Sequence, residues 1–210
     1  MARTAGFNAQ HERYDAWFVH HEAAYHSELL AVRAFLPWQG MGLEVGVGTA
    51  RFAAPLGVHV GLDPSGEMLL HAARRGVRAV RGIAEALPFA KGIFDYILVV
   101  TTICFVDDVP AMMAEAHRVL KRRGEMVIGF IDRDSAIGQF YLAHQAENVF
   151  YKEATFHSAA EVENLLTGAG FHSLVWVQTL SAPLEESREI EPLQPGHGRG
   201  SFVVVKATRR

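Results

Sequence analysis

The stretch Leu43–Thr49, which reads Leu-Glu-Val-Gly-Val-Gly-Thr, decides the fold of this chain. It joins a short apolar run, typical of a buried strand, to two glycines that allow the backbone to approach a ligand closely. The helical segment that we expect next would turn its free N–H groups toward the same ligand. A glycine pair alone occurs in many tight turns, so the loop predicts a ligand site only together with its neighbours.

Two acids near this loop indicate what kind of ligand it holds. Glu44 stands two residues before Gly46, and its charge disfavours a pyrophosphate and favours a ligand with a positive group. Arg51 takes the place of the third glycine of the dinucleotide fingerprint, which argues against NAD. Asp63, 19 residues after Glu44, ends a second apolar run and is placed to accept hydrogen bonds from both hydroxyls of a ribose. The alternative is that Asp63 only forms a turn and a helix cap.

Short apolar runs alternate with helical patterns along most of the chain. Five runs are expected to be parallel strands with helices on both sides of the sheet, at residues 43–45, 58–62, 77–80, 94–100 and 126–131. Helices are expected between and after them, at residues 22–35, 65–75, 108–122 and from Ser158, with a capping box at Glu161, to Gly168 or Gly170. In the first helix, the apolar stripe is expected at Leu29, Leu30, Val32, Phe35 and Leu36. Two last runs, 174–177 and 202–205, are joined without a helical pattern, which predicts an antiparallel pair.

The composition limits the class of protein. The chain has 210 residues, 50% of them hydrophobic, and a net charge of −3, which suits one well-buried core and gives no basic surface for nucleic acid. The single cysteine, Cys104, excludes an intramolecular disulfide, is expected to be a buried thiol and fits a cytoplasmic location. No apolar run reaches the ~20 residues of a membrane span, and none of the 11 histidines falls in a zinc spacing, so we expect no bound metal.

Six ordered segments together resemble the motifs of class I S-adenosylmethionine (SAM)-dependent methyltransferases, most closely the ubiquinone/menaquinone-biosynthesis-like (type 11) family. They lie at residues 43–49, 61–69, 82–89, 94–108, 115–124 and 161–171, and the stretch from Phe7 to Phe18 is similar to the family's N-terminal segment. The sequence departs from the family pattern at Ala50, at Ile83, where many members have an acid that reads adenine, and at Arg122–Gly124.

The resemblance implies a Rossmann-like α/β fold. Its seven-stranded sheet would be mostly parallel, with a C-terminal antiparallel strand and helices on both faces. One domain would cover residues 1–210, with a helical cap at 1–36, a cofactor-binding core at 37–131, a candidate substrate-pocket insert at 132–157, and the late helix with the final strand pair at 158–210.

The resemblance also implies site residues. Those expected to bind SAM are Glu44, Gly46, Gly48, Thr49, Asp63, Pro64, Met68, Ala84 and Thr101. Residues outside the cofactor motifs are candidates for the substrate pocket: Tyr14, Trp17, Phe18, Thr102, Phe105, Asp132, Tyr141 and Tyr151. The alternatives are that the N-terminal aromatics only pack on the core and that the insert is a solvated helix face.

The expected reaction is in-line transfer of the SAM methyl group to a small molecule, with S-adenosylhomocysteine (SAH) as the product. Because SAM is already activated, the protein mainly supplies alignment and a dry site, and the sequence identifies no catalytic residue. The acceptor atom, carbon, nitrogen or oxygen, stays open, as does the choice between monomer and homodimer. The alternatives are a SAM- or SAH-binding protein without turnover and an NAD(P)-dependent oxidoreductase.

Overall fold

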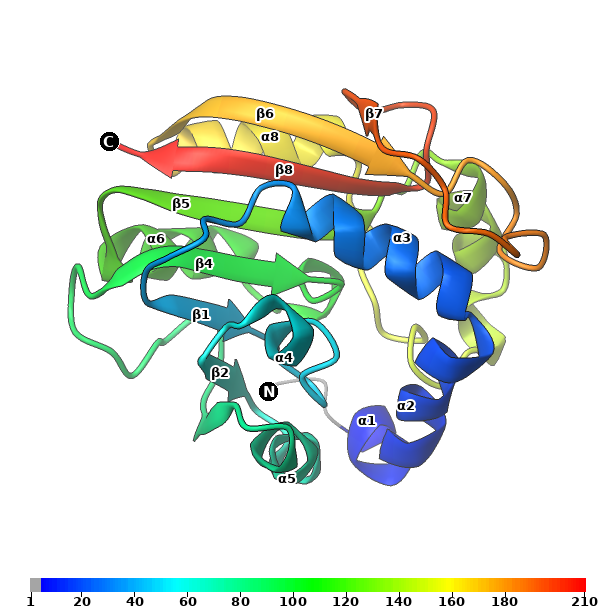
Figure 1. Ribbon diagram of the computed structural model, residues 1–210, viewed down its shortest axis with the longest axis horizontal. Helices are drawn as coiled ribbons and strands as arrows, with labels where there is room; N and C mark the ends of the chain where they lie inside the picture. Colours follow the sequence, from blue (N-terminus) through cyan, green and yellow to red (C-terminus); the bar gives the residue numbers. More distant parts are fainter. Residues whose placement is uncertain (1–4) are drawn as a thin grey trace.

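One eight-stranded sheet forms the centre of the computed structural model, which describes residues 5–210 (Figure 1). The strand order is β3-β2-β1-β4-β5-β8-β6-β7. The strands are β1 (Gly42–Val45), β2 (Val60–Asp63), β3 (Arg78–Arg81), β4 (Phe94–Val100), β5 (Leu120–Ile131), β6 (Phe171–Thr179), β7 (Gln194–Pro195) and β8 (Phe202–Arg209). The first five are parallel, and β8, β6 and β7 add antiparallel neighbours, which confirms the mostly parallel Rossmann-like fold.

The count of seven strands is wrong, because β7 is an eighth. This strand consists of Gln194 and Pro195, which pair with Gln178 and Val177 at the edge of the sheet. An edge position tolerates proline, which has no N–H to donate to a further strand. Two residues inside a polar connection show no apolar alternation, so nothing in the sequence marks them as a strand.

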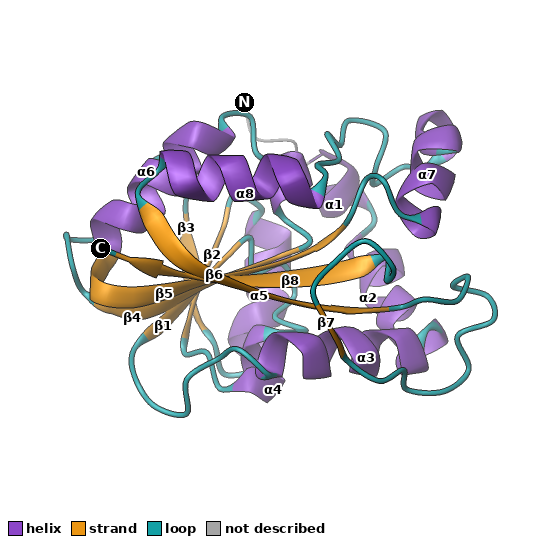
Figure 2. Cartoon of the chain, turned by 90° about the horizontal axis from the view of Figure 1, so that it is seen from above, coloured by secondary structure: helices purple, strands orange, loops and turns teal. Residues whose placement is uncertain are grey.

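The helices cover both faces of the sheet, as Figure 2 shows for α6 and α8 on one side and α3 and α4 on the other. They are α1 (Ala5–Ala9), α2 (His11–His20), α3 (Glu22–Arg33), α4 (Ala53–Leu56), α5 (Gly66–Arg74), α6 (Val109–Val119), α7 (Ala136–Ala143) and α8 (Ala159–Gly168), with 3-10 turns η1 (Ile103–Phe105) and η2 (Gln145–Glu147). The capping box of Ser158 and Glu161 is present at the start of α8. α6 ends before the expected residue 122, because Leu120 already belongs to β5.

Strand β4 connects the two halves of the core. Ile97 and Val99 pack with α6 and α8, whereas Leu98 and Val100 pack with α3, α4 and α5 on the opposite face. This alternation explains why the strand is apolar at every position from 96 to 100. Because β4 is packed on both faces, it gives the residues that follow its carboxyl end a rigid support.

Helix α3 buries most of the expected apolar stripe but not Leu30. Val32 and Leu36 are buried, and Leu29 and Phe35 pack against the same core. Leu30 is 48% exposed, whereas the buried positions are Ala24, Tyr25, Ser27, Glu28, Ala31 and Val32. The buried set follows helical spacing, but it also contains an acid and a serine, so the apolar stripe reveals only part of it. The serine has a clear partner, since Ser27 Oγ accepts a hydrogen bond from the backbone of Glu191 in the long connection before β8.

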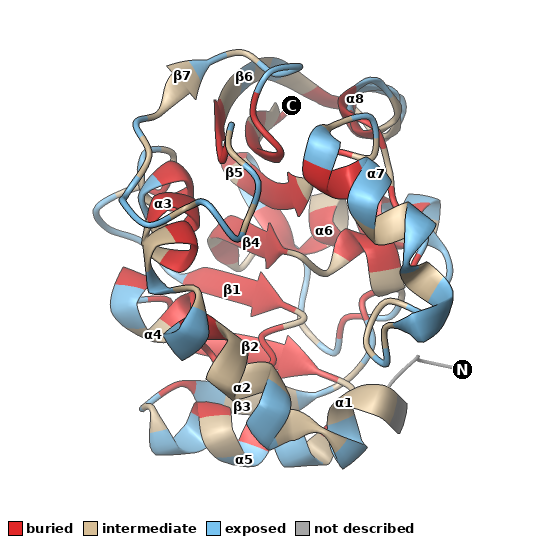
Figure 3. Cartoon of the chain, turned by 90° about the vertical axis from the view of Figure 1, so that its right-hand side faces the viewer, coloured by how far each residue is buried: buried red, intermediate tan, exposed pale blue. Residues whose placement is uncertain are grey.

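The N-terminal helices α1 and α2 cross the carboxyl ends of β1 and β2 (Figures 1 and 3). Within residues 5–210, no helix has the length and apolar character needed to cross a membrane. The same residues contain no group of three or more His, Cys, Asp or Glu side chains that could hold a metal ion.

Candidate functional site

A cavity of about 630 Å³ lies at the carboxyl ends of β1, β2 and β4. The chain runs outward from β1 to β2 on one side and returns to β4 on the other, so this is the switch point of the sheet, where α/β proteins bind ligands. The volume falls within the range of ~300–1,000 Å³ typical of small-molecule sites. The cavity is lined by Val45 of β1 and Gly46 directly after it, by Leu62 and Asp63 of β2, and beyond β4 by Thr101.

The glycine loop after β1 turns back under this cavity. Gly46 has a φ of 73°, and a Cβ atom placed on it would lie 2.2 Å from Oγ1 of Thr102. Only glycine therefore fits, for both conformational and steric reasons. Thr102 Oγ1 in turn donates hydrogen bonds to the carbonyl oxygens of Gly46 and Val100, at 3.2 and 2.9 Å. These contacts fix the conformation of the loop, in which Gly46 and Gly48 line the cavity.

Asp63 connects the loop after β1 to the turn after β2. Its Oδ2 accepts a hydrogen bond from Gly48 N at 2.9 Å, and its Oδ1 accepts one from Ser65 N at 2.8 Å. Each carboxylate oxygen keeps a second lone pair, and Asp63 lines the cavity. Burial raises the pKa of Asp63 and outweighs the two backbone hydrogen bonds, which act in the opposite direction. Asp63 can therefore stabilise the turn and still accept hydrogen bonds from a ligand.

Glu44 lies behind the loop and does not line the cavity. Its carboxyl is buried, and its Oε2 has no hydrogen-bond partner among the described residues. Burial raises the pKa of Glu44 well above its usual range, with a further upward contribution from Asp63. A hydrogen bond from the backbone of Ala53, at the start of α4, acts against this rise.

Thr49 is also held away from the cavity, by a cluster that we call the Asp15 cluster and that consists of Asp15, Thr49, Arg51 and Arg75. Asp15 on α2 accepts hydrogen bonds from Thr49 Oγ1 and Arg51 Nε, each at 2.8 Å, and from Arg75 Nη2 at 2.9 and 3.0 Å. Burial acts to raise the pKa of Asp15, but these hydrogen bonds hold it well below its usual range. The cluster fastens α2 to the glycine loop and to the end of α5.

Four other residues expected at the cofactor line the cavity: Pro64, Met68, Ala84 and Thr101. Thr101 has a φ of 47°, a strained value for a β-branched residue, and such strain gathers at functional sites. Ile83, which stands where many family members have an acid, also lines the cavity. The nearest acid in sequence, Glu85, accepts hydrogen bonds from the backbone N–H groups of Asp107 and Asp108.

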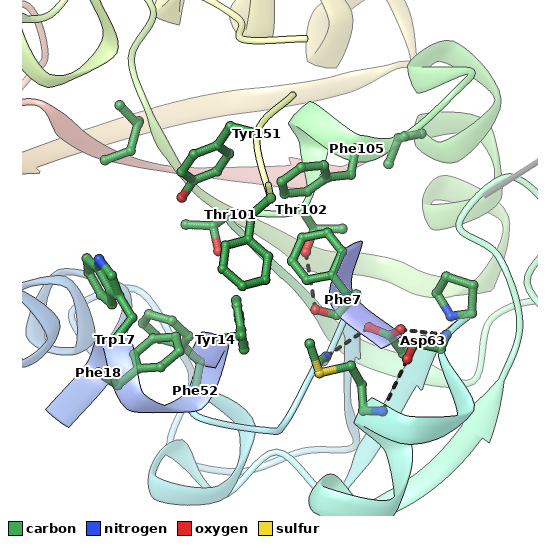
Figure 4. Close-up of a pocket in the computed structure, with 18 of the residues that line it drawn as sticks. Phe7, Tyr14, Trp17, Phe18, Phe52, Asp63, Thr101, Thr102, Phe105 and Tyr151 are labelled. Carbon is green, nitrogen blue, oxygen red and sulfur yellow. Dashed lines mark hydrogen bonds between the residues drawn. The ribbon is translucent and has the colours of Figure 1, made fainter. Parts of the chain in front are cut away.

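Aromatic rings close the other end of the cavity (Figure 4). Phe7 of α1 makes edge contacts with Tyr14 of α2 and with Phe105 of η1, at centroid distances of 5.7 and 5.0 Å. Phe105 stacks on Tyr151, with centroids 5.9 Å apart, and Tyr151 contacts Tyr141 of α7 at 4.8 Å. These rings come from segments far apart in the sequence, yet they form one connected wall.

The expected pocket residues line this cavity with one exception. Tyr14, Trp17, Phe18, Thr102, Phe105, Tyr141 and Tyr151 are all in its lining. Asp132 is not. Its buried carboxyl accepts hydrogen bonds from the backbone of Asp134 and of Ala159, and so holds the start of the insert against α8. An acid directly after a strand resembles a site residue in sequence, but this one is a local cap.

Many lining residues were not among those expected; they include Phe7, Arg13, His20, His21, Glu28, Phe52, Phe150 and Leu184. Glu28 carries a sequence signal, because it lies at helical spacing between Tyr25 and Val32 on the buried face of α3. Leu184 has none, since it comes from the polar connection between β6 and β8, which folds back over α3.

The comparisons with known proteins agree with this architecture. A family model described as a methyltransferase domain matches residues 43–128. An uncharacterized protein of Methanocaldococcus jannaschii is 39% identical over 97% of the chain and 98% of its own length. An uncharacterized protein of Mycobacterium tuberculosis is 38% identical over 92% of the chain and 70% of its own length.

A crystal structure from Thermotoga maritima, described as a SAM-dependent methyltransferase and possible histamine N-methyltransferase, superimposes with a TM-score of 0.95. It is 44% identical, and the match covers 98% of both chains. The chain belongs to the class I SAM-dependent methyltransferases. The parallel sheet, the glycine loop at its switch point and the cavity above that loop are the features that carry this membership.

Proposed function

We propose that this protein binds SAM over the glycine loop and transfers its methyl group to a small molecule held among the aromatic rings. The observation that carries the proposal is that one cavity extends from Gly46, Gly48 and Asp63 to the aromatic wall. A donor and an acceptor can therefore lie in contact inside a single enclosure, as an in-line displacement requires.

The residues at the loop end fit SAM. The second lone pairs of Asp63 are available to accept hydrogen bonds from ribose hydroxyls, and the bare backbone at Gly46 and Gly48 allows close approach of the methionine part. Pro64 and Met68 supply apolar surface for the adenine, and Ala84 places backbone groups beside it. Thr101, at the tip of β4, stands between this end and the aromatic end.

The chemistry then needs little from the protein beyond positioning. SAM supplies an activated methyl group, and the aromatic residues hold the acceptor and exclude water from it. Glu44 and Thr49 support this arrangement indirectly, since the first is buried behind the loop and the second belongs to the Asp15 cluster.

Calorimetric titration with SAH, and separately with NADH, tests the cofactor. We expect SAH to bind in the micromolar range or tighter and NADH not to bind. Tight binding of NADH without binding of SAH would contradict the proposal. Production of SAH from SAM on adding an acceptor tests turnover, and histamine belongs in the first set because of the description of the Thermotoga maritima protein.

A further inference from the structure

Glu28 of α3 is an acid in the lining of the cavity at the aromatic end. The residue is 4% exposed, so its carboxyl has lost almost all contact with bulk water. Among residues 5–210, no side chain or backbone N–H donates a hydrogen bond to that carboxyl, and no lysine or arginine pairs with it. Burial is the only cause that shifts its pKa, which rises to about 8.

The titratable groups on which the Glu28 charge acts are four tyrosines. They are Tyr25 on its own helix, Tyr14 on α2, Tyr141 on α7 and Tyr151 in the insert, and each is influenced by the Glu28 charge. Burial raises the pKa of all four phenols, so they stay neutral at physiological pH. The two arginines of the neighbouring Asp15 cluster are already paired with Asp15. Arg13, His20 and His21 of α2 also line the cavity, but none of them forms an ion pair with Glu28 or contributes to the shift of its pKa. Among the described residues, Glu28 therefore has no paired counter-charge.

A buried carboxyl without a partner is costly, and the cost is removed when a ligand supplies a hydrogen-bond donor or a cation. The surrounding rings favour the same kind of ligand, because aromatic faces attract cations and exclude water. An anionic acceptor, by contrast, would meet both the Glu28 carboxyl and the negative faces of the rings. The enclosure of Glu28 by Tyr14, Tyr141 and Tyr151 therefore selects for a nitrogen base.

We propose that the methyl acceptor is a primary or secondary amine whose nitrogen is bound by Glu28, which also takes up the proton that the amine must lose. This inference rests on the proposed function, since SAM is the methyl donor. The aromatic wall would hold the hydrocarbon part of the amine, and the carboxyl would hold its nitrogen.

The proton transfer follows from the physics of the enclosure. An amine arrives from water mostly as an ammonium ion, which has no lone pair for attack. Burial disfavours both the ammonium and the carboxylate, so in this cavity the N–H bond breaks and an oxygen of Glu28 takes the proton. The free amine lone pair then forms the new N–C bond with the methyl carbon while the C–S bond breaks and its electron pair goes to sulfur. The products are SAH, the N-methylated ammonium ion of the acceptor and protonated Glu28, which returns its proton to solvent when the products leave.

The test compares the wild type with Glu28→Gln, which keeps the shape of the side chain and removes its ionisation. The matched control is Glu22→Gln on the same helix, because the side chain of Glu22 is 77% exposed. Production of SAH is followed with butylamine, benzylamine and 2-phenylethylamine, and with 2-phenylethanol and 3-phenylpropanoate as oxygen counterparts. SAH affinity is measured by calorimetry for all three proteins.

We expect the wild type to methylate at least one amine more than tenfold faster than either oxygen compound. Glu28→Gln should lower kcat/KM for that amine at least a hundredfold and leave SAH affinity within twofold, whereas Glu22→Gln should change neither. The wild-type kcat/KM should rise with pH through a group that titrates near 8, a feature absent from Glu28→Gln. Glu28→Asp, which keeps a carboxyl, should recover part of the activity.

Turnover of amines by Glu28→Gln at the wild-type rate would overturn the inference, as would preference for an oxygen compound. So would rejection of every amine by a wild type that binds SAH, and in that case the proposed function stands. If the wild type does not bind SAH, the proposed function itself fails, and this inference fails with it. Because SAH affinity reports the folded state of each variant, loss of amine turnover alone is not confused with misfolding.

Discussion

The two ends of the cavity are built in different ways. The loop end consists of backbone turns after neighbouring strands, fixed by glycine geometry and by the hydrogen bonds of Asp63 and Thr102. The aromatic end consists of side chains from α1, α2, α3, η1, α7, the segment after η2 and the connection before β8. Substitutions of side chains leave a site built from backbone largely unchanged, so the loop end can keep the same ligand. The aromatic end is built from side chains, so substitutions there can change which acceptor it binds.

Gly46→Val gives the largest effect expected from this comparison. The new side chain would collide with Thr102 and would require a β-branched residue at positive φ, so we expect SAH binding to be lost and the protein to be destabilised by ~2–4 kcal/mol. Gly168→Ala is the control, since a Cβ there meets nothing within 4 Å. Calorimetry and thermal unfolding measure both effects, and unimpaired binding by the valine variant would show that the loop end is not controlled by its backbone.

Glu28→Gln should alter how stability depends on pH. The folded-state pKa of Glu28, about 8, lies above the value of 4.5 that applies when the chain is unfolded. Between these values the folded state holds the extra proton, so wild-type stability falls as pH rises from about 4.5 and levels off above 8. At ~1.4 kcal/mol per pKa unit, the glutamine variant should gain a few kcal/mol on the wild type between pH 5 and 9. Urea unfolding measures the stability of both proteins at each pH. If the difference in unfolding free energy between them does not change with pH over this range, the burial argument is contradicted.

Asp63→Ala should weaken SAH binding at least tenfold, because the proposed hydrogen bonds to the ribose hydroxyls would be lost together with the hydrogen bond from Gly48. The control is Asp134→Ala, an exposed acid outside the cavity. Calorimetry on folded protein decides the question. An affinity equal to that of the wild type would leave Asp63 with only its role in the turn.

Tyr14→Ala should have the smallest effect, a reduction of kcat/KM of about tenfold with the fold intact. The Tyr14 hydroxyl lies 3.6 Å from where a Cβ on Gly48 would be, so this ring meets both ends of the cavity. Loss of its packing and water exclusion should therefore affect turnover more than SAH affinity. Leu30→Ala, on the exposed side of α3, is the control. Unchanged kinetics after deletion of residues 1–20 would remove the N-terminal helices from the site altogether.

The same contrast explains what the sequence could predict. The loop end is encoded by contiguous motifs, so the strand–loop–strand unit around Gly46 and Asp63 could be read directly, and β4 was predicted with its observed bounds. The aromatic end is assembled by tertiary contacts between distant segments. Leu184 reaches it only because its connection folds back over α3, and the two-residue strand β7 in the same connection has no local pattern.

Acidic residues were the hardest to interpret. Asp132 and Asp63 both directly follow or end a strand, but one caps an insert and the other faces the cavity. Glu28 lies in the middle of a helix, where an acid is usually solvated, so its spacing with Tyr25 and Val32 was the one local signal of its burial. Which face of an amphipathic helix is buried depends on its neighbours, and α3 is covered by a chain segment more than 150 residues further on, at Glu191.

The Asp15 cluster has a consequence for the time that a ligand spends inside the protein. The N-terminal helices are fastened to the loop and to α5 by ion pairs whose side chains are 20–28% exposed, within reach of solvent ions. Such pairs weaken as salt rises, whereas the contacts among the aromatic rings do not. Because Arg51 and Arg75 pair with the same Asp15, movement of Asp15 breaks both ion pairs at once. The rate at which SAH dissociates should therefore increase with ionic strength, so a higher salt concentration should shorten the time that SAH stays bound.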